Sequence, residues 1–268
     1  MLHVVHDAGV GSQPAILCRG LSKVYETRDG GQVSALQSLD ISIAPGEFIA
    51  VVGPSGCGKS TLLKLLAGLI LRSAGTLLLS GESVEGPRRD IGMVFQAATL
   101  LDWRTVLQNV MLPIDVLGLN RRRYRERALE LISLVGLAGF ENKYPGELSG
   151  GMQQRVALSR SLIHDPALLL MDEPFGALDA LTRETMNLEL QRIWMEAGKT
   201  VVLITHSISE AVFLGDRVAV MTSRPGRLAE IVPVHLPRPR TLDMMTGPEF
   251  GSAVNHIREL LNTGGQVD

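Results

Sequence analysis

The chain has 268 residues and a hydrophobic fraction of 45%, which is enough to bury the core of one large domain or two small ones. Its formal net charge of −2 gives no basic excess of the kind that nucleic-acid-binding proteins carry. No apolar run approaches the roughly 18–20 residues needed to cross a bilayer, and the first residues lack the basic and apolar regions of a signal peptide, so we expect a cytoplasmic protein.

The first predicted elements are a tail and a small antiparallel layer. Residues 1–14 mix Gly, Ser, Gln and Pro without periodicity, which is typical of a flexible tail. Within residues 15–45, short alternating segments on either side of the Asp-Gly-Gly turn at 29–31 predict antiparallel strands. Tyr25 lies in this layer, where its ring either stacks on an adenine face or packs in the core or on the surface.

A glycine-rich loop follows the next predicted strand. Residues 48–52 are apolar and predict a buried strand, and leucines at helical spacing after residue 61 predict a helix. Glycines between them let backbone N–H groups point inward and form an anion-binding nest at the positive end of that helix. Lys59 is expected to contact β- and γ-phosphates, and the Ser60 hydroxyl to ligate Mg²⁺. The predicted nucleotide-binding residues are Gly53, Pro54, Ser55, Gly56, Cys57, Gly58, Lys59, Ser60 and Thr61.

The chain has two cysteines, Cys18 and Cys57, which are too few for a disulfide framework and lack metal-ligand spacing. Cys57 lies inside the phosphate loop, either as an oxidation-sensitive thiol or as a small side chain that the loop tolerates.

Helical sequence then interrupts the strands. After predicted strands at 76–80 and 91–95, apolar spacing predicts helices over 106–117, 121–135 and 152–163. Strand-type sequence resumes at residue 168, so we expect an inserted helical subdomain at about 100–163. Five arginines between 121 and 127 alternate with acidic residues and have only Tyr124 as an aromatic neighbour, which favours a solvated helix face over a nucleic-acid patch.

The remaining elements alternate between strand and helix. Strands at 168–171 and 200–205 and helices at 182–197 and 207–214 predict a parallel sheet with right-handed crossovers. A hairpin over 217–232, a proline-containing connector over 233–246 and a helix over 248–261 complete the chain.

Polar residues follow two of the predicted buried strands. Asp172 is placed to hold Mg²⁺ beside Ser60, and Glu173 is placed to orient and polarise an attacking water. His206 ends the neighbouring strand, from which it reaches the γ-phosphate. The competing interpretation is that these residues only begin the helices that follow. It is weaker, because the carboxyl ends of two parallel strands lie at the same edge of the sheet as the phosphate loop.

A second anion site is predicted at residues 148–155. Ser149 is expected to cap the helix that follows, so its hydroxyl, the N–H groups of Gly150 and Gly151 and the helix dipole together favour a negative ligand. One nucleotide needs one such cradle, so the second cradle is expected to close over the γ-phosphate of ATP bound to a partner molecule.

These motifs, in this order, resemble those of the ATPase subunits of ATP-binding-cassette transporters over about residues 15–235. The resemblance implies an α/β fold in which a P-loop NTPase, RecA-like core carries an antiparallel β layer and the inserted helical subdomain. It also implies three regions: a flexible tail at 1–14, the ATPase domain at 15–235, and a linker with a C-terminal helix at 236–268.

Roles follow from the resemblance position by position. Tyr25 is similar to the adenine-stacking aromatic, and Gln96 to the residue that senses Mg²⁺ and the attacking water. Glu173 resembles the general base and His206 the γ-phosphate switch, while Asp179 lies in the segment found at the dimer seam. Gln96 therefore joins Ser60 and Asp172 in the expected Mg²⁺ set. Position 152 is Met where the family usually has Gln, so no polar contact is expected from that side chain.

Shorter stretches at 99–106, 148–152 and 223–227 resemble the branch that imports nitrate, sulfonates, taurine and related small anions. This implies a homodimer that encloses two ATP molecules, held through integral-membrane permease subunits at the cytoplasmic face of the membrane and served indirectly by a substrate-binding protein. Leu100 to Trp103 would dock the permease, unless Trp103 packs into the helical subdomain.

Three alternatives remain open at this point. One is an importer or exporter of another cargo, such as a lipid or vitamin precursor. Another is a cassette ATPase acting on DNA or ribosomes, although such proteins usually carry two cassettes, zinc cysteines or long coiled coils. The third is a phosphoryl-transferring kinase, which leaves residues 148–155 without a role.

Overall fold

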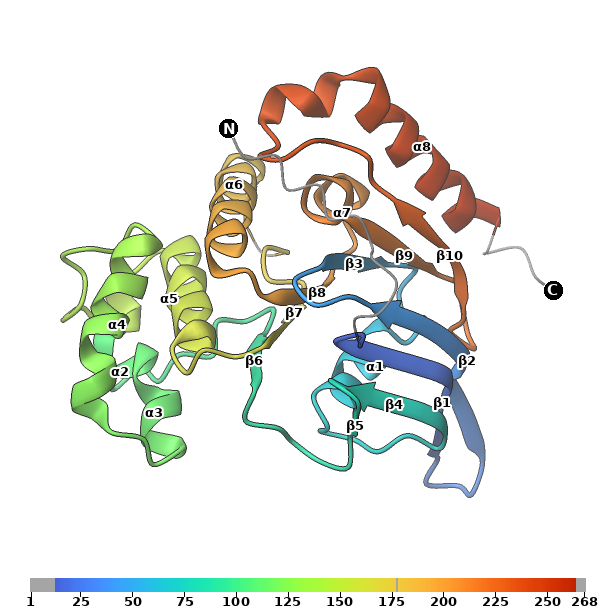
Figure 1. The fold of residues 1–268 in the computed structure, drawn as a ribbon, viewed down its shortest axis with the longest axis horizontal. Helices are drawn as coiled ribbons and strands as arrows, with labels where there is room; N and C mark the ends of the chain where they lie inside the picture. The colour runs from blue at the N-terminus through green and yellow to red at the C-terminus, as the bar shows by residue number, and fades with distance from the viewer. Residues whose placement is uncertain (1–12, 177, 264–268) are drawn as a thin grey trace.

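Two sheets form the body of the protein in the computed structural model, which describes residues 13–176 and 178–263 (Figure 1). The larger sheet has the order β10-β9-β3-β8-β7-β6. Its strands are β3 (Phe48–Val52), β6 (Ile91–Val94), β7 (Leu168–Asp172), β8 (Thr200–Ile204), β9 (Arg217–Met221) and β10 (Leu228–Pro233). All neighbours are parallel except β10, which pairs antiparallel with β9. The predicted parallel sheet and closing hairpin are confirmed.

The smaller sheet is antiparallel and has the order β2-β1-β4-β5. It contains β1 (Ile16–Glu26), β2 (Gln32–Ile43), β4 (Ala74–Leu79) and β5 (Glu82–Ser83). The predicted antiparallel layer is therefore confirmed, with longer strands than the alternation indicated. Helix α1 (Lys59–Leu66) packs between the two sheets, where its leucines share a core with Ile16 of β1 and Ile49 of β3.

Strand β3 separates two hydrophobic cores. Phe48, Ala50 and Val52 point into one core, and Ile49 and Val51 into the other, as the two-residue period of a strand requires. All five side chains are buried, which explains why this strand reads as a continuous apolar run.

The inserted helices form a separate lobe, at the left of Figure 1. They are α2 (Val106–Val110), α3 (Leu112–Val116), α4 (Arg121–Leu134) and α5 (Gly150–Leu162), with a 3₁₀ turn at Pro145–Glu147 before α5. The prediction of one helix over 106–117 is wrong, because Pro113 has no N–H to continue the helix and stands in the first turn of α3 instead. Helix α5 begins at Gly150, two residues before the predicted start at 152.

Three helices cover the other face of the parallel sheet: α6 (Ala180–Ala197), α7 (Ile208–Leu214) and α8 (Pro248–Thr263) (Figure 1). Helix α8 packs through Phe250, Val254 and Ile257. The connector before it is anchored by Arg240, which is 2% exposed and donates to the carbonyls of Val212, Phe213 and Gly215 at the end of α7. Among the described residues, no helix has the length and apolar character needed to span a membrane.

Candidate active site

The glycine-rich loop joins the carboxyl end of β3 to α1. Gly56 and Gly58 have φ angles of 76° and 93°, in the left-handed region that favours glycine. A Cβ at Gly58 would lie 2.7 Å from the carbonyl oxygen of Ala35 in β2, so the loop is also pressed against the antiparallel sheet. The Lys59 ammonium is buried over the loop and donates to the carbonyl oxygens of Gly53 at 2.8 Å and Pro54 at 3.0 Å.

Two polar groups face each other across the first turn of α1 and the end of β7. The Ser60 Oγ lies 3.5 Å from Oδ1 of Asp172, so one hydroxyl and one carboxylate stand where a shared cation would meet both. Burial raises the pKa of Asp172, and the hydrogen bond from Ser60 partly opposes that rise. These oxygen donors, completed by phosphate oxygens, fit the hard-ligand preference of Mg²⁺.

Glu173 and His206 meet at the adjoining strand ends. The Nδ1 of His206 lies 3.3 Å from Oε2 of Glu173. Glu173 has a φ of 46°, rare for a residue with a side chain, and its N–H donates to the Ile204 carbonyl at 2.9 Å. Backbone strain of this kind persists only where the surrounding structure holds it, and here the Ile204 carbonyl binds the strained Glu173 backbone while its carboxylate lies beside His206.

Gln96 follows β6 and completes the edge. The Gln96 side chain is exposed. A Cβ added at Gly176 would lie 3.7 Å from the Gln96 Nε2 and 3.5 Å from the His206 Cε1. The Gln96 and His206 side chains therefore both lie next to Gly176. Strands β3, β8, β7 and β6 are neighbours in the sheet, and their carboxyl ends lie at one edge. This edge carries the phosphate loop with Lys59, and the predicted site residues His206, Asp172, Glu173 and Gln96. Ligands bind at this edge in α/β folds.

Tyr25 is neither a core residue nor remote from the loop. Its side chain is 37% exposed, and its hydroxyl lies 3.5 Å from Oγ1 of Thr61 at the start of α1. The Lys23 Nζ lies 5.1 Å from the ring centre. The ring is thus available for contact beside the phosphate loop, and the alternative of core packing is not observed.

The second predicted anion site lies in the helical lobe. Ser149 caps α5, and its Oγ accepts a hydrogen bond from the Met152 N–H at 3.3 Å. Ser149 and Gly150 are exposed, whereas Gly151 is buried against Thr182 of α6. Asp179 caps α6 by accepting from the Thr182 N–H at 3.0 Å, and residue 177, two positions before Asp179, lies outside the described residues.

The two cysteines are buried. Burial raises the pKa of Cys57, with the nearby Lys59 charge opposing the rise, and burial raises the pKa of Cys18 to about 12. Neither thiol has the exposed, low-pKa character of a reactive cysteine, which favours the interpretation of Cys57 as a tolerated small side chain.

Sequence patterns missed the residues that hold the Gln96 loop. The Gln154 Nε2 donates to the Phe95 carbonyl at 3.0 Å, and Arg160 donates to the carbonyls of Ala98 and Thr99 at 2.7 and 2.8 Å. Both side chains come from α5, so the helix capped by Ser149 also holds the loop that carries Gln96.

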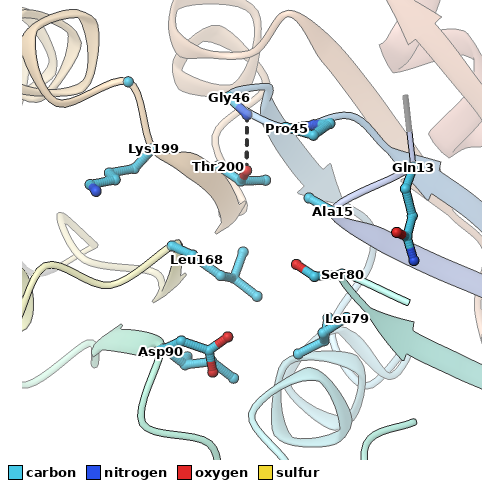
Figure 2. Close-up of a pocket in the computed structure, with 13 residues that line it drawn as sticks. Gln13, Ala15, Pro45, Gly46, Leu79, Ser80, Asp90, Leu168, Lys199 and Thr200 are labelled. Atoms are coloured by element: carbon cyan, nitrogen blue, oxygen red, sulfur yellow. Dashed lines mark hydrogen bonds between the residues drawn. The ribbon is translucent and has the colours of Figure 1, made fainter. Parts of the chain in front are cut away.

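A cavity of about 350 Å³ lies at the opposite edge of the sheet (Figure 2). Leu168 and Thr200, the first residues of β7 and β8, line it, and the Thr200 hydroxyl accepts the Gly46 N–H at 3.0 Å. The amino ends of parallel strands are not where nucleotides bind in such folds, so this cavity is distinct from the candidate active site.

Comparison with known proteins agrees with this geometry. A family model described as ABC transporter matches residues 36–176. The chain is 51% identical over 237 residues to an uncharacterized ABC transporter ATP-binding protein of Methanocaldococcus jannaschii, with 88% of each chain covered. It is 48% identical over 210 residues to the taurine import ATP-binding protein TauB of a Jannaschia species, with 78% of each covered.

A solved structure shares the fold. The ATP-binding cassette MJ0796, in a dimeric post-hydrolysis state bound to ADP and Pi, superposes with a TM-score of 0.72 at 33% identity, covering 83% of this chain and 100% of that one. By sequence and by fold, the chain belongs to the ABC transporter family and is an ATP-binding, ATP-hydrolysing subunit of that family.

Proposed function

We propose that this chain hydrolyses ATP as a head-to-tail dimer and thereby drives a membrane permease that imports a small anion. The observation that carries the proposal is the position of two cradles in different lobes. Lys59 and the strand-end residues lie at the sheet edge, whereas the exposed cap Ser149 stands on α5 of the helical lobe. A second copy, turned around, can bring its Ser149 to the first copy's phosphates.

In this proposal, residues 53–61 receive the phosphates through backbone N–H groups. The Lys59 ammonium, which now donates to two loop carbonyls, turns to the β- and γ-phosphates. Ser60 and Asp172 would hold Mg²⁺, with Gln96 as a further ligand, and Tyr25 would stack on the adenine. Bound Mg²⁺ would supply positive charge that offsets the charge of the phosphates.

Glu173 then serves as the general base for the attacking water. Its backbone is held by the Ile204 carbonyl and its carboxylate by His206, so the group is oriented before substrate arrives. His206 also donates to the γ-phosphate. The partner's cradle, formed by its Ser149, Gly150 and Gly151, closes on the same phosphate and excludes water. The dimer of the related cassette MJ0796 supports this arrangement.

The permease would dock beside the Gln96 loop. Trp103 is 75% exposed, which argues against its packing into the helical subdomain and favours its use as a contact. The subunit would then lie at the cytoplasmic face of the membrane through the permease, with a substrate-binding protein delivering cargo from outside. Taurine import by the relative TauB, together with the short stretches at 99–106 and 223–227, supports a sulfonate, nitrate or similar anion as the cargo.

Glu173→Gln tests the catalytic part of this proposal. The amide cannot accept the proton of water, so the variant should bind ATP normally and accumulate as an ATP-bound dimer, measured by light scattering after size-exclusion chromatography. Phosphate release should fall by about 100-fold or more, as expected for loss of a general base. Wild-type turnover by a species shown to be monomeric during the reaction would overturn the head-to-tail arrangement.

A further inference from the structure

The loop over residues 222–227, between β9 and β10, packs against the outer side of the phosphate loop. Nε of Arg224 donates to the Gly56 carbonyl at 3.0 Å. A Cβ added at Gly56 would lie 2.9 Å from one terminal nitrogen of the same guanidinium, so Arg224 lies directly over that glycine. The stretch 223–227 resembles one branch of the family, but no step of the proposed reaction uses it.

Gly226 fixes the position of this loop. A Cβ at Gly226 would lie 1.9 Å from the Cys57 carbonyl oxygen, so only glycine allows the approach. Its N–H donates to the Ala35 carbonyl at 3.1 Å, and its own carbonyl accepts the Gln37 N–H at 2.9 Å. The loop is therefore held to β2 on one side and to the phosphate loop on the other.

The Arg224 contact determines how one peptide of the phosphate loop is turned. In a planar trans peptide, the carbonyl of Gly56 and the N–H of Cys57 point in opposite directions. Because Arg224 holds the carbonyl outward, the N–H is directed inward, where it donates to the Pro54 carbonyl at 3.3 Å. Lys59 Nζ donates to that same carbonyl, so two donors expected to meet phosphate face the same point inside the loop.

We propose that Arg224 is a positioning residue that presets the phosphate loop for nucleotide binding. Its charged donor fixes the orientation of the Gly56–Cys57 peptide and polarises it, which strengthens the inward N–H as a donor to an anion. Arg224 acts through the backbone and not through contact with the base. The inference rests on the proposed role of residues 53–61 as the phosphate cradle.

Arg227 provides a matched control in the same loop. Its guanidinium donates to Oε1 of Gln37 at 2.6 and 3.2 Å, on the β2 side and away from the phosphate loop. Arg227→Ala therefore removes the same residue type and a charged hydrogen bond, but leaves the Gly56 carbonyl bound.

The test measures kcat, KM and equilibrium nucleotide affinity for Arg224→Ala, Arg224→Lys and Arg227→Ala. Arg224→Ala should raise KM and weaken ATP binding by about fivefold to tenfold, with kcat within about twofold, as expected for one charge-assisted hydrogen bond at an exposed site. Arg224→Lys should recover part of the loss, and Arg227→Ala should stay within about twofold of wild type. The loss for Arg224→Ala should be equal for ATP and for a triphosphate with an altered base.

Equal losses of ATP affinity in Arg224→Ala and Arg227→Ala would overturn the inference. Such a result would reflect the stability of the 222–227 loop and not the conformation of the phosphate loop. A fall in kcat at unchanged KM would overturn it as well. Lys59→Ala separates the inference from the proposed function. If Lys59→Ala leaves ATP affinity intact, the phosphate cradle itself is wrong. If it weakens ATP binding while Arg224→Ala does not, only the role of Arg224 fails.

Discussion

Ser149 has two possible roles, and two substitutions separate them. Within its own chain it caps α5 through the 3.3 Å bond from the Met152 N–H. In the proposed dimer its exposed hydroxyl also meets the partner's γ-phosphate. Aspartate is as good a helix cap as serine, and its charge suits the helix N-terminus, so Ser149→Asp should preserve stability. Ser149→Ala removes the cap and should cost about 1 kcal/mol, which is about 2–4 °C in melting temperature for a domain of this size.

For hydrolysis, the two variants are expected to rank the other way, with Ser149→Asp less active than Ser149→Ala. A carboxylate in place of the hydroxyl would stand about 4 Å from phosphate charge in the closed dimer, where an effective dielectric constant near 20 gives a repulsion of about 4 kcal/mol. At about 1.4 kcal/mol per factor of ten, the closed state and hydrolysis should weaken by roughly a thousandfold. Ser149→Ala loses one hydrogen bond to a charged group, about 1.5–3 kcal/mol, or roughly tenfold to a hundredfold in phosphate release.

The assay combines phosphate release with unfolding by denaturant on the same preparations. Stability should rank Ser and Asp above Ala, while activity should rank Ser above Ala above Asp. ATP affinity of the single subunit should remain close to wild type in both variants, because Ser149 belongs to the helical lobe and not to the phosphate loop. If Ser149→Asp hydrolysed ATP as fast as Ser149→Ala or faster, the serine would act only as a cap and the two-copy site would be refuted.

The remaining predictions concern stability and docking. Glu210 is 4% exposed, and burial raises its pKa, with the hydrogen bond from Thr205 opposing the rise. Because the folded protein holds this proton more tightly than the unfolded chain, the wild type should lose stability as pH rises through the raised pKa. The melting temperature of Glu210→Gln relative to wild type should therefore increase from about pH 5 to about pH 8, and a constant difference would contradict this sign. Arg240→Ala should lower the free energy of unfolding by about 3–5 kcal/mol, because three carbonyls at the end of α7 lose a buried donor. A denaturant titration measures this loss, and a value below about 1 kcal/mol would mean that water replaces the guanidinium. Trp103→Ala should leave hydrolysis by the isolated subunit unchanged but reduce co-purification with the permease, and unchanged co-purification would remove Trp103 from the docking surface.

Local sequence was sufficient for most of the candidate site. A glycine-rich loop between a buried strand and a helix places Lys59 and Ser60, and an apolar run places Asp172 and Glu173 at its end. Parallel strands must end at a common edge, so His206 could be assigned to the same place without knowledge of the strand order. These inferences succeed because short-range sterics and hydrogen bonding fix the strand, the loop and the helix start.

Other features depend on contacts that leave no local pattern. Arg224 and Gly56 are 168 positions apart, and nothing in either segment predicts their hydrogen bond. The same holds for Arg240 at the end of α7, and for Gln154, which joins α5 to the Gln96 loop. The sequence alone determined which elements form and which chemical groups stand at their ends. Only the tertiary structure decided which distant side chains hold those elements in place, because such contacts depend on how packed elements meet and not on the spacing of residues within any one of them.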